Sequence, residues 1–580
     1  MSPLDWLIVV ALNAPVIVYV LLRSSRTETS RDWFLAGRTL PWWIVGLSMY
    51  ATAIDSSDMV VDSGGAYQFG VSMFVVNWIG IVGGWLLLAH WIGLPMYRAG
   101  MYTNAEYLEA RFGLAARVIS VLVQVLFRTM VLALLAKSMF LTLAIVLTLS
   151  AAAAWAIVFT IALVATLYTV TGGLKAVAVT DAMQSFVMIL ASVTIFCLVF
   201  NRVGGWSGVE RRLDRSSKQN AAALMHVGRP RIEQVNARAL SDVEVSGQLL
   251  LGGELSDSQQ TIVHRSPAWI IFLNLVIAGM AYAVVNHTQS MRMFGARSEW
   301  DFKMSAVLAG VVLIVVTFFN LSLGVMGRAL YPTAQSLPLD ESLQTVDAIF
   351  PVLVRDLAVS GLRGVMIAGI MAASFSTYDS IGSTLSALLT RDIYARLIVR
   401  HRGDRHYLAV GRWLTPVIIF GSFAYLPWIS GGMFNFYLEM VATFVTPLLV
   451  LYLLGALTPV ARCSGTLGLI AGVGVGVWSL IARSVAARYG VALLPRPLLE
   501  PLAAAPLSTG ATAAVMLLAS GFAGWVPRDE RLRQIEVWSD ASDQPAPRPE
   551  EPSTRYQNMP AWAGLAILAV GLYLTFVVFW

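Results

Sequence analysis

Three aspartates, Asp55, Asp58 and Asp62, interrupt an otherwise apolar run that reads WWIVGLSMYATAIDSSDMVVDSGGAYQFG from residue 42 to residue 70. Ionisable side chains inside a membrane segment are costly and usually mark a substrate or ion pathway. Spacings of three and four would align them on one face of a continuous helix, but Asp-Ser-Ser-Asp also competes for backbone hydrogen bonds. The pattern predicts a helix broken near residues 55–58, which would expose carbonyls and helix ends to an ion or solute. Asp62 either joins this site or is solvated near the outer interface.

A second polar constellation lies in the run GIMAASFSTYDSIGSTLSALLTRDIY, residues 369–394. Its small side chains favour either close helix packing or a cation cage, because hydroxyl and carbonyl oxygens can replace the hydration shell of a hard cation. Asp379, placed among hydroxyls, favours the cage, and Thr377 flanks it. The small residues that share one helix face are Gly369, Ala373, Ser376 and Ser380.

The elements that position these residues are membrane helices. Only 13% of the 580 residues are charged and 57% are hydrophobic, whereas soluble domains carry roughly 25% charged residues. The net charge of +6 does not indicate nucleic-acid binding, because the basic residues lie mostly in short loops between apolar runs. The two cysteines, Cys197 and Cys463, are far apart and belong to no CxxC or Cys/His cluster, so neither a zinc site nor a disulfide framework is expected.

A membrane-spanning helix needs about 20 mostly apolar residues. The first run lacks a basic leader region, so we interpret it as a retained helix. About fourteen runs satisfy the length criterion: 4–23, 42–68, 71–96, 115–147, 151–171, 178–202, 267–290, 304–331, 356–384, 405–430, 432–458, 464–488, 506–526 and 560–580.

The short loops predict the orientation, because Lys and Arg accumulate on the cytoplasmic side. An even number of helices then places both termini in the periplasm. Residues 203–266 become a periplasmic loop, in which the stretch 245–251 suggests a small hairpin, and the Pro-rich segment 527–559 becomes a cytoplasmic linker. The basic residues counted as cytoplasmic are Arg26, Arg31, Arg38, Arg98, Arg111, Arg117, Arg292, Arg297, Lys303, Arg391, Arg396, Arg400, Arg402 and Arg405.

Other polar residues within the runs are less specific. Arg128 either pairs with an acidic residue of the pathway or reaches the membrane interface. Gly80 and Gly84 form a GxxxG pair that predicts close helix packing.

Several stretches, in this order along the chain, resemble the sodium:solute symporter family. They are FLAGRTLPWW (34–43), the run from Ser48 to Gly70, MYTNAEYLEARFG (101–113), YTVTGGLKAVAVTDAMQ (168–184) and the serine-rich helix that ends in TRDIY (390–394). The resemblance spans about residues 30–460.

The resemblance implies an all-α membrane protein with a LeuT-like core of two inverted five-helix repeats and additional helices. It divides the chain into an N-terminal helix (1–30), the first repeat (31–202), the periplasmic loop (203–266), the second repeat (267–460), two peripheral helices (461–526), the cytoplasmic linker (527–559) and a C-terminal helix (560–580).

The resemblance also implies a principal sodium site between the broken first core helix and the eighth. The matching oxygens are the carbonyls of Ala51, Ile54 and Ala373 and the hydroxyls of Ser376 and Thr377. In some members a fifth-helix acid, here Asp181, and later eighth-helix serines hold a second sodium. The matching positions are Asp379 and Ser380, and the aspartate leaves a second sodium ion or a proton open there.

Solute contacts in the family fall on the first, second and sixth core helices, and NHTQSMR (286–292) departs from the usual sixth-helix pattern. Positions that are neutral in the sugar carriers are acidic here, so a cationic or amino-bearing solute and a sugar whose hydroxyls donate to carboxylates both remain open. The expected solute-binding residues are Asp55, Ser57, Asp58, Asn77 and Asn286.

The function predicted is sodium-coupled symport of a small polar organic solute, such as a sugar or an amino acid, into the cell by alternating access. The expected place is the inner (plasma) membrane, with Na+ co-transported and without enzymatic activity, nucleic acid or an obligate protein partner. The alternatives are proton coupling by the same fold and a solute sensor, which would need a signalling domain that 527–559 does not supply. An enzyme would need a nucleophile–base pair, and none accompanies the aspartates.

Overall fold

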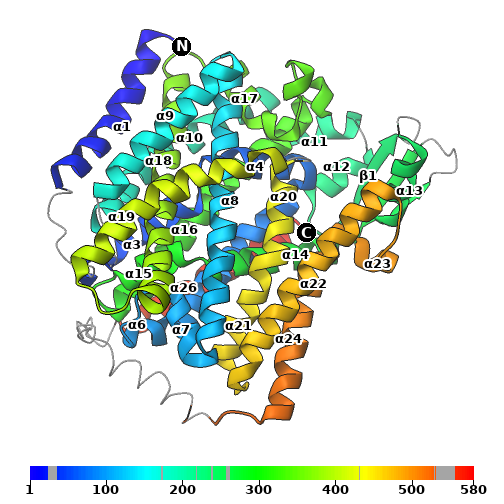
Figure 1. Cartoon of the computed structure of the whole chain (residues 1–580). Helices are drawn as coiled ribbons and strands as arrows, with labels where there is room; N and C mark the ends of the chain where they lie inside the picture. Colours follow the sequence, from blue (N-terminus) through cyan, green and yellow to red (C-terminus); the bar gives the residue numbers. More distant parts are fainter. Residues whose placement is uncertain are drawn as a thin grey trace.

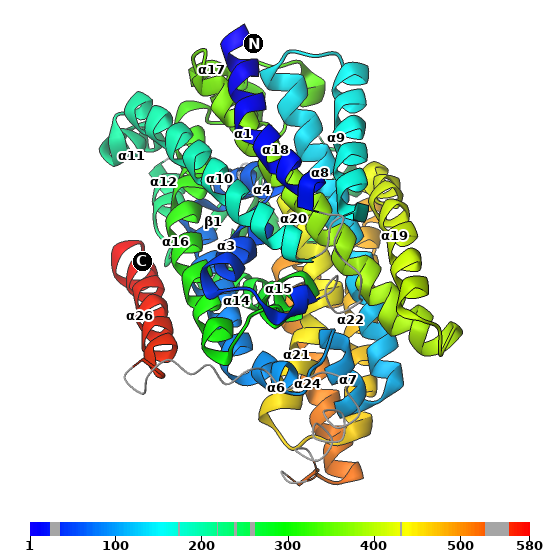
Figure 2. The same cartoon turned by 90° about the vertical axis from the view of Figure 1, so that its left-hand side faces the viewer.

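Long apolar helices stand side by side around a buried centre in the computed structural model (Figures 1 and 2). The structure describes residues 1–23, 35–171, 174–216, 218–236, 240–255, 261–429, 432–527, 530 and 556–580. Most of the predicted linker 527–559 lies outside the described residues.

Within the described residues, 10 helices are long and apolar enough to cross a membrane. The four other predicted runs coincide with α1, with the broken pair α3 and α4, with α9, and with the serine-rich α18. The helical membrane architecture is therefore confirmed, while the count of fourteen crossings stays a prediction.

The first half of the chain contains the following elements: α1 (Pro3–Arg23), η2 (Ala36–Arg38), α3 (Trp42–Ala53), α4 (Ser56–Phe69), η3 (Gly70–Met73), η4 (Val76–Ile81), α5 (Val82–Leu87), η5 (Leu88–Ile92), α6 (Gly93–Arg98), α7 (Asn104–Phe112), α8 (Leu114–Val146), α9 (Ala151–Thr171) and α10 (Leu174–Val203).

The second half begins after the polar segment and contains α14 (Ala268–Val285), α15 (His287–Phe294), α16 (Glu299–Leu330), η7 (Ala334–Ser336), η8 (Glu341–Leu343), η9 (Val346–Ala348), α17 (Ile349–Leu357), α18 (Leu362–Leu388), η10 (Leu389–Ile398), α19 (Asp404–Gly421), η11 (Ser422–Trp428), α20 (Met433–Met440), η12 (Val441–Val445), α21 (Thr446–Leu457), α22 (Arg462–Tyr489), α23 (Arg496–Leu499), η13 (Pro501–Ala503), α24 (Ala504–Ala523), α26 (Met559–Tyr573) and η14 (Leu574–Val578).

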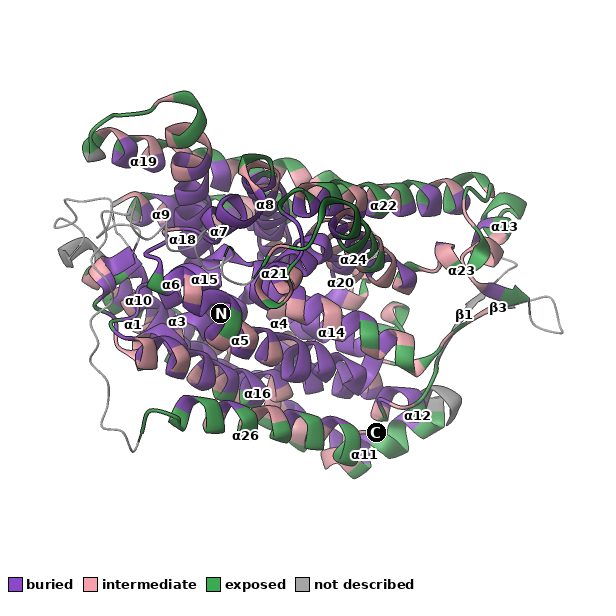
Figure 3. Ribbon diagram, turned by 90° about the horizontal axis from the view of Figure 1, so that it is seen from below, coloured by how far each residue is buried: buried purple, intermediate pink, exposed green. Residues whose placement is uncertain are grey.

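The broken pair α3 and α4 lies at the centre of the molecule. Helix α3 packs against α10, α16 and α18, and α4 packs against α8 and α16. Buried residues accordingly fill the middle of the bundle, while peripheral helices such as α22 and α26 present exposed faces (Figure 3). Those faces carry large apolar side chains, including Trp478 and Trp562, as expected of a surface in contact with lipid.

The predicted close packing at Gly80 is confirmed. Gly80 of η4 lies against Gly279 of α14, and a Cβ atom added to Gly279 would stand 2.1 Å from the carbonyl oxygen of Val76. No larger residue fits at Gly279 without moving the backbone. The contact fixes α14 against the segment that carries Asn77.

The hairpin predicted at 245–251 in the polar segment is wrong, because these residues lie mostly in helix α13 (Asp242–Leu250). Ser241 and Glu244 form a reciprocal cap at its start, a local signal that outweighs apolar alternation. The strands lie elsewhere, in an antiparallel sheet of order β1 (Arg231–Asn236), β3 (Thr261–Ser266) and β2 (Gly253–Leu255). Helices α11 (Gly205–Ser216) and α12 (Lys218–Met225) precede the sheet.

Four arginines that were counted as loop charges are buried, which corrects that prediction. Arg38, Arg111, Arg117 and Arg292 are 8%, 2%, 4% and 0% exposed. They bond to other parts of the chain, so they are structural charges rather than indicators of a cytoplasmic loop. The predicted orientation then rests on the remaining basic residues and is still a prediction.

Candidate ion and solute site

The predicted helix break lies at Ile54 and Asp55. Ile54 is extended, with φ −119° and ψ 103°, between the end of α3 and the start of α4. The Asp55 carboxylate accepts hydrogen bonds from the backbone N–H groups of Ser57 (2.7 Å) and Asp58 (3.0 Å), and Asp58 accepts one from the backbone N–H of Asp55 (2.8 Å). This reciprocal capping box satisfies the first donors of α4, so the two aspartates themselves create the break.

The break releases carbonyl oxygens from α3. In an uninterrupted helix the Asp55 N–H would bond to Ala51, but here it bonds to the Asp58 side chain. The Ala51 carbonyl instead accepts the Ser376 hydroxyl at 3.3 Å, and the Thr52 carbonyl accepts the Tyr282 hydroxyl at 3.2 Å. Helix α18 is thereby joined to the break, as expected for the principal sodium site.

Thr377 adds a buried oxygen that is free to bind a cation. It is 1% exposed, and its Oγ1 has no hydrogen-bond partner among the described residues. Ala373, four residues before it, is fully buried on the same helix. Hydroxyl and carbonyl oxygens suit a hard cation such as Na+, so the donor set fits the expected ion.

A second helix break lies at Asn286, between α14 and α15. Asn286 has φ −65° and ψ 104°, and its side chain accepts the Thr288 N–H at 3.1 Å. The analysis of the sequence missed this break, although an asparagine is a preferred N-cap residue and this one follows an apolar run. Gln289 of α15 donates to the Thr52 hydroxyl at 3.0 Å, which links the two breaks.

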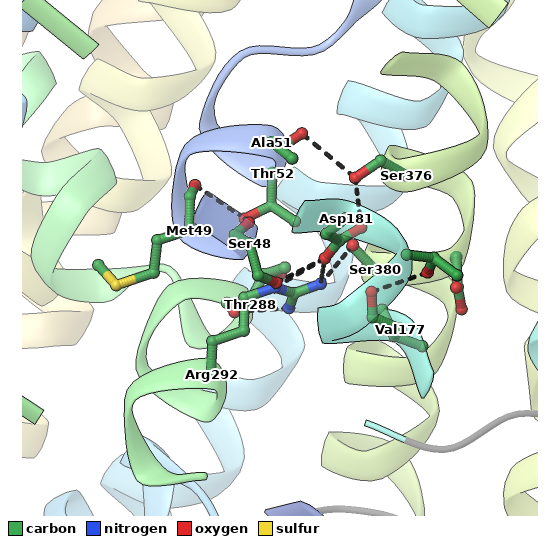
Figure 4. Close-up of polar contacts among 12 residues, drawn as sticks. Ser48, Met49, Ala51, Thr52, Val177, Asp181, Thr288, Arg292, Ser376 and Ser380 are labelled. Atoms are coloured by element: carbon green, nitrogen blue, oxygen red, sulfur yellow. Dashed lines mark hydrogen bonds and ion pairs between the residues drawn. The ribbon is translucent and has the colours of Figure 1, made fainter. Parts of the chain in front are cut away.

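Of the residues predicted for a second cation, Asp181 and Ser380 are brought together, at the side chain of a third residue. Asp181 and Ser380 both bond to the guanidinium of Arg292 (Figure 4), with 3.0 Å between Arg292 Nη2 and Asp181 Oδ2. Asp379 is also buried, and its Oδ1 lacks a hydrogen-bond partner within the described chain. Arg292 resembled a loop charge in the sequence, so its contacts with Asp181 and Ser380 were not predicted.

Four of the five expected solute residues, Asp55, Ser57, Asp58 and Asn77, line one small cavity of about 40 Å³ beside the first break. Asp62 belongs to this cavity and is 8% exposed, which decides between its two interpretations. Asn286 does not line the cavity. The polar lining residues are Asp55, Ser57, Asp58, Asp62, Asn77, Arg128, Tyr282 and Tyr437.

Arg128 shares the cavity with the three aspartates, so it lies in the pathway rather than at the membrane interface. Its guanidinium carbon is 5.7 Å from the centre of the Tyr282 ring. The lining therefore combines three carboxylates with one guanidinium, a set that can hold a polar solute.

A second, larger cavity of about 540 Å³ lies between the polar segment and the end of α4. Phe69 lines this outer cavity, Phe434 lines the inner one, and their rings pack edge to face at 5.7 Å. The aromatic pair therefore separates the two cavities. The buried charges of the inner cavity make it the better candidate for solute binding, despite its small volume.

Two discontinuous helices that meet at buried polar residues inside a helical bundle are typical of secondary transporters. The sodium:solute symporter family matches residues 33–472, and the chain belongs to this family. It is a sodium-coupled solute symporter, with Na+ as the co-transported ion.

Two curated relatives are transporters as well. The chain is 28% identical to sodium/glucose cotransporter 2 of Rattus norvegicus over 504 residues, which cover 83% of this chain and 72% of the relative. It is 27% identical to sodium/myo-inositol cotransporter 2 of Sus scrofa over 475 residues, which cover 79% and 66%.

Solved structures agree on the fold. A substrate-bound, outward-open Na+-coupled sialic acid symporter matches with a TM-score of 0.69 at 18% identity, covering 91% of this chain and 99% of the other. MHP1, a nucleobase-cation-symport-1 family transporter in a closed conformation, matches with a TM-score of 0.50 at 13% identity, covering 88% and 99%. The LeuT-like fold class expected from the sequence is confirmed.

Proposed function

We propose that the symporter carries a small organic solute rich in hydrogen-bond donors into the cell across the inner membrane. The observation that carries this proposal is the set of three aspartates in the inner cavity. Ionised carboxylates only accept hydrogen bonds, so hydroxyl or ammonium groups complement them. The relatives named for glucose and myo-inositol agree with a polyhydroxylated solute.

An anionic solute fits the cavity less well. The N-terminus of a half-helix ordinarily attracts a carboxylate, but the start of α4 is already capped by Asp55 and Asp58. A solute carboxylate would also face the acceptor oxygens of three aspartates in this cavity. We therefore expect discrimination against acidic sugars and in favour of neutral polyols and amino sugars.

Sodium binds, in this proposal, to the carbonyls of Ala51, Ile54 and Ala373 and to the hydroxyls of Ser376 and Thr377. Bridging α3 and α18, the ion favours the outward-open state that admits the solute. The coupling is reciprocal, because sodium must raise solute affinity by the factor by which solute raises sodium affinity. A membrane potential of 100 mV adds about 2.3 kcal/mol per charge.

The decisive experiment is uptake into proteoliposomes with and without an inward sodium gradient. The labelled panel contains glucose, myo-inositol, glucosamine, sialic acid and proline. We expect sodium-stimulated uptake of a polyol or an amino sugar. Sialic acid as the preferred solute would contradict the solute class, and uptake driven equally by a proton gradient would contradict the assigned roles of the sodium ligands.

The matched variants are Ser376→Ala and Ser383→Ala, two serines of the same buried helix. The Ser376 hydroxyl reaches the α3 carbonyl, whereas the Ser383 hydroxyl bonds to carbonyls of its own helix at Asp379 and Ser380. We expect Ser376→Ala to raise the sodium concentration for half-maximal uptake by about tenfold, equivalent to roughly 1.4 kcal/mol. Ser383→Ala should leave it unchanged.

A further inference from the structure

Asp5 is a buried carboxylate on α1, a helix that lies outside the residues matching the family. Helix α1 (Pro3–Arg23) precedes the matched residues 33–472, and Asp5 is 1% exposed. Burying a carboxylate is unfavourable unless hydrogen bonds compensate the loss of water. The hydrogen bonds of Asp5 therefore indicate what its side chain does.

The Asp5 carboxylate caps the start of α18. Its Oδ1 accepts the backbone N–H groups of Gly361 at 2.7 Å and Gly364 at 3.0 Å, while its Oδ2 accepts the N–H and the hydroxyl of Ser2. Gly361 is the N-cap residue of α18 and supplies no side-chain cap. The first N–H groups of a helix need acceptors, and a negative charge is favourable there. Asp5 thus provides, from another helix, the cap that α18 lacks.

Helix α1 packs closely against the first half of α18 and also contacts α10 (Figure 2). A Cβ atom added to Gly364 would stand 2.7 Å from Asp5 Cα, so the two backbones touch there. Further along α18, a Cβ atom added to Gly369 would stand 2.5 Å from Ala191 Cβ of α10. The first half of α18 is therefore held by α1 and α10 together, without room for a shift toward either helix.

A second polar contact from α1 lies nearer to the proposed sodium ligands. Asn13 is 5% exposed, and its Nδ2 donates to the Ala368 carbonyl at 3.3 Å. Ala373 and Ser376 follow on the same continuous helix, so a displacement of its start moves them too. Ser376 reaches the Ala51 carbonyl of α3 at 3.3 Å, and such a displacement would change that distance.

We propose that Asp5 is a positioning residue for sodium binding, which holds α18 from α1 so that the oxygens of α18 meet those of α3. The inference rests on the proposed function, because it assumes sodium ligands on α18. Ligand groups must be held within about 0.5 Å of their productive geometry. Loss of the cap lets the start of α18 fray or shift, and sodium then binds more weakly.

The test is equilibrium binding of radioactive sodium to the purified full-length protein, without any solute. Asp5→Ala removes both capping bonds and should raise the sodium dissociation constant by about fivefold, equivalent to roughly 1 kcal/mol. Asp5→Asn keeps an oxygen that can accept both N–H groups, and asparagine is a preferred cap, so it should bind sodium like the wild type. A purely structural role would reduce the yield of folded protein and leave the dissociation constant unchanged.

Two matched controls accompany these variants. Leu7→Ala changes a 65% exposed side chain of the same helix and should leave sodium binding unchanged. Gly364→Ala disturbs the contact from α18, because the added methyl group would push Asp5 away, and it should also weaken sodium binding. Gly421→Ala is its control, since a Cβ atom there meets nothing within 4 Å. Size-exclusion chromatography of each variant establishes that it remains folded.

A folded Asp5→Ala variant with the sodium affinity of the wild type would overturn the inference. So would an Asp5→Asn variant as weak as Asp5→Ala, because capping would then not be the cause. If Asp5→Ala does not fold, Gly364→Ala decides in the same way. Ser376→Ala keeps the two failures distinguishable, because an unchanged dissociation constant in that variant would overturn the proposed sodium site itself.

Discussion

Asp58 has two tasks at the first helix break. One carboxylate oxygen caps the backbone N–H of Asp55 at 2.8 Å, and the residue also lines the inner cavity. An asparagine keeps a carbonyl oxygen that can accept the capping bond, but it removes the charge. The two tasks can therefore be separated by a single substitution.

We expect Asp58→Asn to fold normally and to lower the apparent affinity for the transported solute by about tenfold, equivalent to roughly 1.4 kcal/mol. The reason is the loss of one carboxyl oxygen as a hydrogen-bond acceptor, because the amide NH₂ group that replaces it can only donate. The measurement is competition of unlabelled solute at saturating sodium. Asp340→Asn, at an exposed position, serves as the control, and equal affinities in the two variants would remove Asp58 from the solute site.

Buried ion pairs connect the elements that carry the family resemblance. Arg117 of α8 bonds to Asp392 of η10 at 2.6 Å and to Glu109 of α7 at 2.5 Å, and Thr103 donates to Asp392 at 2.9 Å. The stretches 101–113 and 390–394 therefore meet at one cation. Their shared role is to join the two halves of the chain.

Breaking this cluster should destabilise the protein strongly. Asp392→Asn removes one of three carboxylates that pair with buried Arg117, while Glu106 and Glu109 remain, and breaking a buried ion pair costs up to about 3–5 kcal/mol. The exposed pair of Arg98 and Glu299, whose side chains are 57% and 36% accessible, provides the comparison, because Glu299→Gln should cost only about 0–1 kcal/mol. Thermal unfolding in detergent measures both, and similar losses would contradict a structural role for the buried cluster.

Asp347 joins the loop before α17 to the start of α20. Its Oδ2 accepts the Met433 N–H at 3.0 Å, and burial raises the pKa of this carboxyl to about 6, although the Met433 N–H and Lys137 lower it in part. The folded state therefore binds a proton that the unfolded state releases between about pH 4 and pH 6. The contribution of Asp347 to stability is complete below that range and is lost as the pH rises through about 6.

Asp347→Asn removes this dependence. The unfolding temperature of the variant relative to the wild type should therefore increase from pH 4.5 to pH 7, with a change in stability of about 3 kcal/mol at most, since each pKa unit corresponds to about 1.4 kcal/mol. Thermal scans at several pH values measure it, with Asp340→Asn as the control. A difference that is constant with pH would exclude Asp347 as the titrating group.

The orientation of the whole molecule follows from its loops. Residues 332–345 separate α16 from η9 on one side, and the turn with Arg400 and Arg402 separates η10 from α19 on the other. The first is acidic and the second basic, so the positive-inside rule places the first in the periplasm. With the predicted even number of crossings, both termini are predicted to be periplasmic as well.

Cysteine labelling tests this orientation. With Cys197 and Cys463 replaced by alanine, we expect Glu341→Cys to react with a membrane-impermeant maleimide in intact cells. Arg402→Cys should react only after the cells are opened. The opposite pattern would reverse the predicted orientation and with it the assignment of both termini.

Features that depend on local chemistry could be predicted from the sequence. Apolar length predicted the membrane helices, and the Asp-Ser-Ser-Asp stretch predicted the break at Ile54 and Asp55, because a capping box acts within a few residues. The serine-rich face of α18 was likewise readable from its helical spacing. The family resemblance then supplied the inverted-repeat architecture, which no visible repeat in the sequence predicted.

Which distant residues share a site could not be predicted from the sequence and is seen in the folded chain. Arg292 resembles a loop charge in the sequence, yet its partners Asp181 and Ser380 lie 111 and 88 residues away along the chain. The sequence left open whether Asp62 belongs to the site or is solvated near the outer interface. The packing of α4 places it in the inner cavity. Long-range packing sets the burial of a charge and the partners that compensate it, and neither is encoded in local spacing.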